Sequence, residues 1–348
     1  MLYYSLPWVQ ECAVSSRTHP HLHPPTTRWA TLGSLRQILH CAAQKGHGRR
    51  HGRRHARAMS QVLQDLLALL KLEAIEENLF RGASQDLGFR ALFGGQVLGQ
   101  SLSAATQTVE PERHVHSLHG YFLRSGDAAL PVVYQVDRVR DGGSFTTRRV
   151  VAIQKGQPIF TMMASFQGDE PGAAHAATMP DVPGPEGLAS DLERWRRYAH
   201  LVPPRVREKL LCDKPIEIRP VQSVDLVHPL PGAPVKHVWF RADGEMPADP
   251  QVHKYVLAYA SDFNLITTAL VPHALSVMQP DLQAASLDHA LWFHGDVKVN
   301  DWLLYSMDSP WAGGARGLAR GHVFTRDGRL VASVAQEGLM RVRPEKAK

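Results

Sequence analysis

One carboxylate lies in an unusual setting near the middle of the chain. Residues 257–270, LAYASDFNLITTAL, carry Asp262 inside a run of apolar and small residues with helical character. Aspartate is a poor residue for a helix interior and is almost never fully buried without a partner. Asp262 is therefore a candidate for chemistry. Ser261-Asp262 could also be an ordinary pair at a helix N-terminus, where the dipole and free N–H groups stabilise an anion.

Two further polar residues could act with this carboxylate. Ser286 lies in QAASLDHALWFH, and Gln336 lies in VASVAQEGLM, a strand whose other positions are mostly apolar or small. A carboxylate can accept a proton from water while a hydroxyl and an amide hold that water in line with an acyl carbon. Neighbouring N–H groups could stabilise the oxyanion. Such a site would hydrolyse an ester or thioester without a covalent intermediate, although Gln336 could equally be a polar residue near a strand end and Ser286 a common residue before a strand.

Other chemistries find less support in the chain. It has no G-x-S-x-G elbow, no phosphate-binding P-loop and no strand-flanked dinucleotide fingerprint. The histidines after residue 58, which include His119, His273, His289 and His294, show no metal-ligand spacing, and His289 is better explained as a strand residue than as a catalytic base. After residue 58 the only cysteine is Cys212, which excludes an intrachain disulfide there and fits a reducing, cytoplasmic compartment. We expect neither a cofactor nor a metal.

The net positive charge of the chain comes from its N-terminal residues. The chain has 348 residues and a formal charge of +6, but residues 1–58 alone carry +8 and the remainder carries −2. The His/Arg-rich stretch GHGRRHGRRHARA predicts a disordered leader over 1–58, which could be an untranslated extension ahead of Met59. The near-neutral body does not indicate nucleic-acid binding. No apolar run approaches the roughly 18 to 20 residues of a membrane span.

The elements that would position the polar residues occur twice. Helices are predicted over 60–71, with Ser60 as N-cap, and over 92–108, whose small residues would let a sheet approach closely. Strands are predicted at 115–124, 130–140, 144–154 and 158–167, and a linker at 168–210 contains a helical segment broken at Pro203 and Pro204. Strands, a helix around Asp262 and more strands follow.

The second half repeats the first. HGYFLR at 119–124 matches HALWFH at 289–294, and KGQPIFTMMA at 155–164 matches DGRLVASVAQ at 327–336, at offsets of 170 and 172 residues. We therefore expect an α+β fold of two units, 59–167 and 211–344, each with an antiparallel sheet around a helix. Pairing the two sheets edge to edge would cover an open edge. The alignment sets Gln336 against Ala164, so the chemistry would belong to the second unit.

From Met59 to Arg343 the chain resembles the bacterial acyl-CoA thioesterase II family. The stretches that carry the resemblance are FGGQVLGQ, HSLHGYFLRSGD, GGSFTTRRVVAIQKG, YASDFNL, LDHALWFH and VAQEGLMR. The resemblance implies a double hotdog fold, a homo-oligomer (dimer or tetramer), and hydrolysis of fatty acyl-CoA without a metal or cofactor. It also implies that Asp262 is the catalytic aspartate, Gln336 the glutamine, and Ser286 the hydroxyl residue, which is typically threonine in the family.

Two other functions remain open on the sequence. A hotdog enoyl-CoA hydratase or dehydratase would use a histidine with its acid, and we expect no histidine beside Asp262. A non-enzymatic acyl-CoA-binding protein would not need all three polar residues. For contacts to CoA the candidates include Arg148, Arg316 and Arg320, although a solvated strand face explains each of them more simply.

Overall fold

The computed structural model describes residues 58–88, 91–201, 204–222 and 225–343. The predicted leader therefore lies outside the described residues, except for Ala58. The first half contains α1 (Gln61–Leu70), β1 (Glu73–Glu76), β2 (Leu79–Gly82), α2 (Gly94–Thr106), β3 (His114–Phe122), β4 (Val132–Asp141), β5 (Phe145–Gln154) and β6 (Gln157–Gln167). The helix predicted at 60–71 is confirmed, and Ser60 accepts a hydrogen bond from the Leu63 N–H as its N-cap.

The order from β1 to β6 recurs in the second half, with extra elements after its long helix, and the two halves are joined by a connection without strands among its described residues. That connection contains α3 (Asp191–Arg197), the 3₁₀ turn η2 (Ala199–Leu201) and α4 (Pro204–Leu211). It is followed by β7 (Ile216–Pro220), β8 (Val235–Ala242), α5 (Pro250–Ser261), α6 (Leu265–Thr268), η3 (Val271–His273), β9 (Leu282–Ser286), β10 (Asp288–Phe293), β11 (Leu303–Gly313), β12 (Arg316–Thr325) and β13 (Leu330–Val342).

All described strands belong to one antiparallel sheet that runs through both halves. The order is β1-β2-β4-β5-β6-β3-β10-β13-β12-β11-β8-β7, and β9 also pairs with β13. The two halves meet where β3 pairs with β10, with Gly120 opposite His289 and Leu118 opposite Leu291. The predicted edge-to-edge pairing is thus confirmed, and it joins the same two stretches that revealed the repeat.

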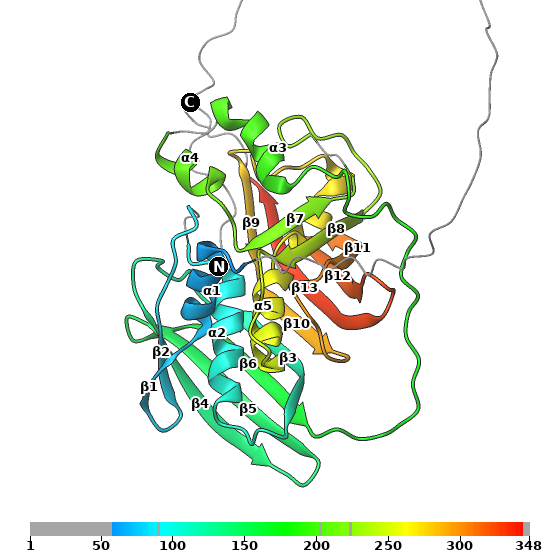
Figure 1. The fold of residues 1–348 in the computed structure, drawn as a ribbon. Coiled ribbons are helices and arrows are strands. Elements are labelled where there is room, and N and C mark those ends of the chain that lie inside the picture. Colours follow the sequence, from blue (N-terminus) through cyan, green and yellow to red (C-terminus); the bar gives the residue numbers. More distant parts are fainter. Residues whose placement is uncertain (1–57, 89–90, 202–203, 223–224, 344–348) are drawn as a thin grey trace, which may run out of the picture.

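The central helices α2 and α5 lie side by side against the curved sheet (Figure 1). A Cβ atom on Gly95 would collide with the carbonyl oxygen of Tyr259, and one on Gly99 would lie 3.1 Å from that of Tyr255. The contacts move forward along α2 and backward along α5, so the helices are antiparallel. The small residues of α2 were expected to admit a sheet, but these two glycines admit the backbone of α5.

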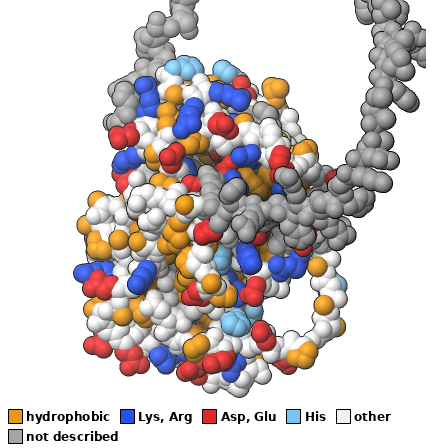
Figure 2. Space-filling view, in the orientation of Figure 1, with side chains coloured by type: hydrophobic (Ala, Val, Ile, Leu, Met, Phe, Trp, Pro, Cys, Tyr) orange, Lys and Arg blue, Asp and Glu red, His pale blue; other side chains and the backbone are white. Residues whose placement is uncertain are grey.

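One face of the molecule is mixed in charge (Figure 2). Acidic and basic side chains are interspersed over the face in Figure 2. Within the part of the chain that the structure describes, no helix combines the length and apolar character needed to cross a bilayer.

Candidate active site

Asp262 lies immediately after the last residue of α5. The helix begins with Asp249 as N-cap, whose carboxylate accepts from the Gln251 N–H, and it ends at Ser261 with Asp262 as C-cap. Asn264 then adopts a left-handed conformation, with φ of 67°, before α6 starts. The expectation that Asp262 lies at the N-terminus of its helix is therefore wrong. At this end the dipole of α5 is negative and does not favour a carboxylate.

The N-terminus of the other central helix lies beside this end of α5. Because α2 and α5 are antiparallel, Gly95 at the start of α2 contacts Tyr259, three residues before Asp262. Phe93, the N-cap of α2, provides no side-chain cap, and its ring stacks on Phe263 with centroids 4.5 Å apart. The first N–H groups of a helix have no acceptor within the helix. The positive end of α2 is thus placed beside the end of α5, which Asp262 directly follows.

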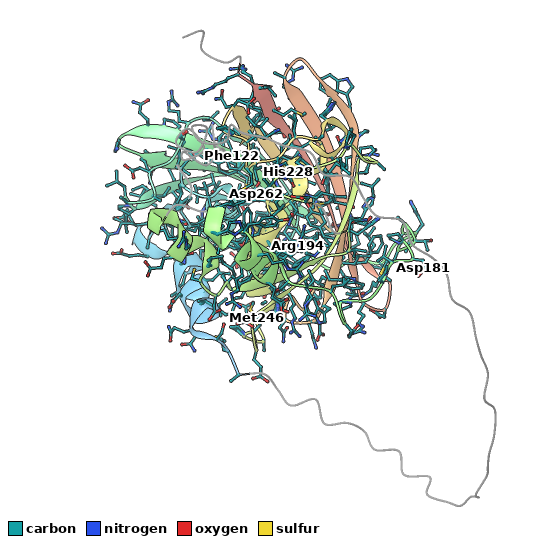
Figure 3. The ribbon with its side chains drawn as sticks, turned by 90° about the horizontal axis from the view of Figure 1, so that it is seen from above. Phe122, Asp181, Arg194, His228, Met246 and Asp262 are labelled. Carbon is teal, nitrogen blue, oxygen red and sulfur yellow. The ribbon has the colours of Figure 1, made fainter. Side chains whose placement is uncertain are left out.

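The three residues singled out in the sequence meet in the interior, where Figure 3 shows Asp262. The Gln336 Nε2 donates to Asp262 Oδ1 at 2.8 Å, and the Ser286 hydroxyl donates to the same oxygen at 3.4 Å. All three side chains are at most 2% exposed. Ser286 and Gln336 reach one carboxylate because β9 pairs with β13, where Ser286 lies opposite Gly338. The hydroxyl and amide were expected to hold a water, whereas here both contact the carboxylate itself.

A fourth residue, His289, borders this group and was not assigned to it from the sequence. Its Nδ1 is 4.0 Å from Asp262 Oδ1, and its Nε2 is 2.9 Å from Ser261 Oγ. His289 does lie in a strand, as predicted, but no histidine was expected beside Asp262. Burial lowers the pKa of His289 to about 3, so the ring is neutral at physiological pH. The signal in the sequence that could have found it is spacing, because His289 lies three residues after Ser286 and alternates with the buried Leu291 and Phe293 along β10.

The polar atoms around Asp262 are only partly satisfied. The Tyr305 hydroxyl donates to the Ser261 carbonyl at 3.0 Å, and burial together with the charge of Asp262 raises the Tyr305 pKa, which keeps the phenol protonated. Two buried acceptors near the carboxylate, Gln336 Oε1 and His289 Nδ1, have no hydrogen-bond partner among the described residues. Buried polar atoms without partners are uncommon, and they are available here to bind a small polar molecule.

A mostly apolar cavity of about 450 Å³ begins at the two residues that follow Asp262. Phe263 and Asn264 line it, together with residues of α3, β8 and the segment after α6, such as Trp195, Val238 and Leu270. Lys236 is a half-buried cation of this cavity, and its Nζ donates to Thr267 Oγ1 at 2.8 Å. Pockets of this size and character are typical small-molecule sites.

The arginines proposed to contact CoA differ from one another. Arg148 is 1% exposed and fixed by Asp141 at 2.6 Å and by Thr108 at 2.9 Å. It is a buried structural residue, so neither expectation for it, a CoA contact or a solvated face, is correct. Arg316 and Arg320 are exposed and paired with Glu337 and Asp308. Among the described residues, no group of three or more His, Cys, Asp or Glu is arranged to hold a metal ion.

Comparison with known proteins identifies relatives over most of the chain. A family model described as acyl-CoA thioesterase matches residues 206–339, and one described as acyl-CoA thioesterase N-terminal domain matches 83–167. Acyl-CoA thioesterase 2 of Haemophilus influenzae is 42% identical over 81% of this chain and 99% of its own. Human acyl-coenzyme A thioesterase 8 is also 42% identical, over 80% of this chain and 89% of its own.

Comparison with solved structures also identifies thioesterases and hotdog folds. The acyl-CoA thioesterase II TesB2 from Mycobacterium marinum is 44% identical, with a TM-score of 0.66 over 80% of this chain and 99% of that one. A hot dog fold protein of unknown function from Alicyclobacillus acidocaldarius is 20% identical with a TM-score of 0.62, and it supports the fold alone. The α+β double hotdog architecture is thereby confirmed. On the matches to both halves and the identity across most of its length, the chain belongs to the acyl-CoA thioesterase family.

Proposed function

We propose that this protein hydrolyses fatty acyl-CoA to free fatty acid and CoA, with Asp262 as the general base. The observation that carries the proposal is the contact of Gln336 and Ser286 with one oxygen of a buried carboxylate. Two donors on one oxygen fix the orientation of the carboxylate and favour its anionic form. A buried carboxylate held in this way is available to accept a proton from water.

The reaction proceeds in two steps. Water attacks the thioester carbon as Asp262 removes one of its protons, and a tetrahedral oxyanion forms. The C–S bond then breaks, and the proton passes from Asp262 to the departing sulfur of CoA. No bond forms between enzyme and substrate. The N–H groups at the start of α2 support stabilisation of the oxyanion, because this uncapped helix end lies next to the end of α5.

We place the acyl chain in the cavity that begins at Phe263 and Asn264. Its lining is mostly apolar, as a hydrocarbon chain requires, and the cavity starts one residue after the proposed base. Thioester and chain would then lie on either side of the Asp262–Asn264 turn.

Two alternative functions are a hotdog hydratase and a non-enzymatic acyl-CoA-binding protein. The 4.0 Å approach of His289 to Asp262 provides the acid and histidine that a hotdog hydratase would use, so addition of water to a 2-enoyl-CoA is the second candidate. A non-enzymatic binding protein has no use for a buried carboxylate, since burying a charge costs free energy. Membership of the thioesterase family favours hydrolysis.

The test is Asp262→Asn, with Asp288→Asn as its matched control. Asp288 is the nearby acid on β10, and its carboxylate accepts instead from the Glu337 N–H. We expect Asp262→Asn to fold and to lose at least about 1000-fold in kcat for CoA release from decanoyl-CoA or palmitoyl-CoA, and Asp288→Asn to stay within about tenfold. Near wild-type turnover by Asp262→Asn would remove Asp262 from this role. Consumption of 2-enoyl-CoA without CoA release would establish the hydratase.

We further propose a cytoplasmic homo-oligomer, a dimer or tetramer. The support is an outward face of β3 and β6 on which Tyr121 is 61% and Met163 40% exposed. Analytical ultracentrifugation tests the assembly, and a monomer at micromolar concentration would contradict it.

A further inference from the structure

His289 is buried next to the proposed base, and the hydrolysis scheme above gives it no role. It is 1% exposed, its Nε2 contacts Ser261 Oγ at 2.9 Å, and its Nδ1 lies 4.0 Å from Asp262 Oδ1. A histidine that served packing alone would not need one ring nitrogen aimed at a carboxylate. The other nitrogen is fixed through the residue directly before Asp262.

The hydrogen bonds of Ser261 assign the tautomer of this ring. Ser261 Oγ lies 2.9 Å from the Ala258 carbonyl as well as 2.9 Å from His289 Nε2. A hydroxyl has one proton to donate, and a carbonyl can only accept. The Ser261 proton therefore goes to Ala258, and Nε2–H donates to Ser261. In the neutral ring, Nδ1 is then an acceptor, and it has no hydrogen-bond partner among the described residues.

Two acceptors thus face each other at a separation that one water can bridge. The 4.0 Å between Nδ1 and Oδ1 is too long for a direct hydrogen bond. A water that donates two hydrogen bonds of about 2.8 Å along its two O–H directions reaches acceptors about 4.5 Å apart, and modest bending brings these closer. With both protons engaged, the lone pairs of that water point away from the two acceptors.

We propose that His289 Nδ1 is the second acceptor for the attacking water, and that Asp262 and His289 together aim its lone pair at the thioester carbon. This rests on the proposed function. As the C–O bond forms, the water proton that is hydrogen-bonded to Asp262 transfers to the carboxylate. The water proton that is hydrogen-bonded to Nδ1 stays on the oxygen, which becomes part of the fatty acid. His289 remains neutral throughout. Ser261 is a positioning residue, because it acts only through the ring.

The surroundings of the ring contain no competing charge in the described contacts. Asp262 approaches from the turn after α5, and the neutral Tyr305 hydroxyl of β11 bonds the Ser261 carbonyl. His289 lies opposite Gly120 of the adjacent strand β3, which has no side chain to contribute a charge. The carboxylate of the neighbouring Asp288 is held by the Glu337 N–H.

Two isosteric substitutions separate catalysis from packing. In His289→Gln, the amide nitrogen occupies the place of Nε2 and keeps the bond to Ser261, but the Nδ1 acceptor is lost. In His289→Asn, the amide oxygen occupies the place of Nδ1, and the bond to Ser261 is lost. We expect kcat for decanoyl-CoA to fall about 100-fold in His289→Gln and less than tenfold in His289→Asn, with KM unchanged in both. The thermal unfolding midpoint should be higher for His289→Gln, which keeps the bond to Ser261, than for His289→Asn, which loses it.

Wild-type kcat in His289→Gln, or a kcat that follows thermal stability across the two variants, would overturn the role. If either variant fails to fold, Ser261→Ala decides. It leaves the ring in place but frees its tautomer, so kcat should fall about tenfold, whereas unchanged kcat refutes the proposal. Asp262→Asn is assayed alongside, since turnover by that variant would refute the proposed function itself, whatever His289 does.

Discussion

The ring of Phe93, at the start of α2, stacks on the ring of Phe263, one residue after Asp262, with centroids 4.5 Å apart. Tyr259 completes the cluster edge-on to both rings, at 5.1 and 5.6 Å. Phe93 belongs to the first half of the chain and Phe263 to the second. The turn that carries the proposed base is therefore held by the half that lacks the catalytic residues.

Gly95→Ala should disrupt this junction. The added methyl group would collide with the Tyr259 carbonyl, and overpacking of this kind costs about 1–3 kcal/mol. Because the displaced backbone leads to Asp262, kcat should fall as well. Gly143→Ala is the control, since a Cβ at Gly143 meets nothing within 4 Å. Equal denaturation midpoints for the two variants would show that the helices do not need the close approach.

Ser286→Thr should be as active as wild type or more so. The extra methyl group restricts χ1 and holds the hydroxyl toward Asp262, where it now donates at a long 3.4 Å. Ser286→Ala should lose about tenfold in kcat, in keeping with one weak hydrogen bond to a charged group. A threonine variant that folds but is less active than the alanine variant would contradict the assigned orientation.

Gln336→Leu should lower kcat by about 100-fold, because Asp262 then loses its 2.8 Å donor. Gln283→Leu is the matched control for this variant. Gln283 is also buried, lies on β9 and accepts from Arg343 rather than contacting Asp262. We expect the control to lose stability but to keep kcat. Steady-state kinetics on both proteins make the comparison, and equal losses would assign Gln336 a structural part only.

Through Lys236, the free energy of unfolding should increase as the pH rises from about 8 to about 10.5. Burial lowers its pKa from 10.5 to about 8. Between these values the unfolded chain holds a proton that the folded chain has released, so raising the pH favours the folded state through this group. Lys236→Met removes this contribution, on the order of 1–3 kcal/mol across the window. Urea denaturation at pH 7.5 and 10.5 measures it, and parallel pH dependence in variant and wild type would exclude it.

The sequence was most informative where a pattern repeats. The matching of residues 119–124 with 289–294 predicted two units joined edge to edge, and those stretches do pair with each other. Asp262, Ser286 and Gln336 stood out because each is a polar residue in an apolar run. Their residue types suggested a common site and a resemblance supported it, but nothing in their spacing reports how β9 and β13 pair.

Other features depend on contacts that the sequence does not display. The end of α5 was missed because neither glycine nor proline marks it, and the left-handed residue is Asn264. Arg148 shares its strand face with the buried Thr146 and Val150, so alternation along β5 would have placed it inside. Its partners Asp141 and Thr108 come from other elements, and without them a buried guanidinium looks prohibitive.

The antiparallel packing of α2 against α5 bears on how such a chain could have arisen. A single ancestral unit could have offered its helix start to the helix end of an identical neighbour only by forming a symmetric pair, which would have contained two equivalent catalytic centres. Once both copies were fused in one gene, selection could maintain one centre and let the other decay. Ala164, which aligns with Gln336 in the sequence repeat, fits such a loss.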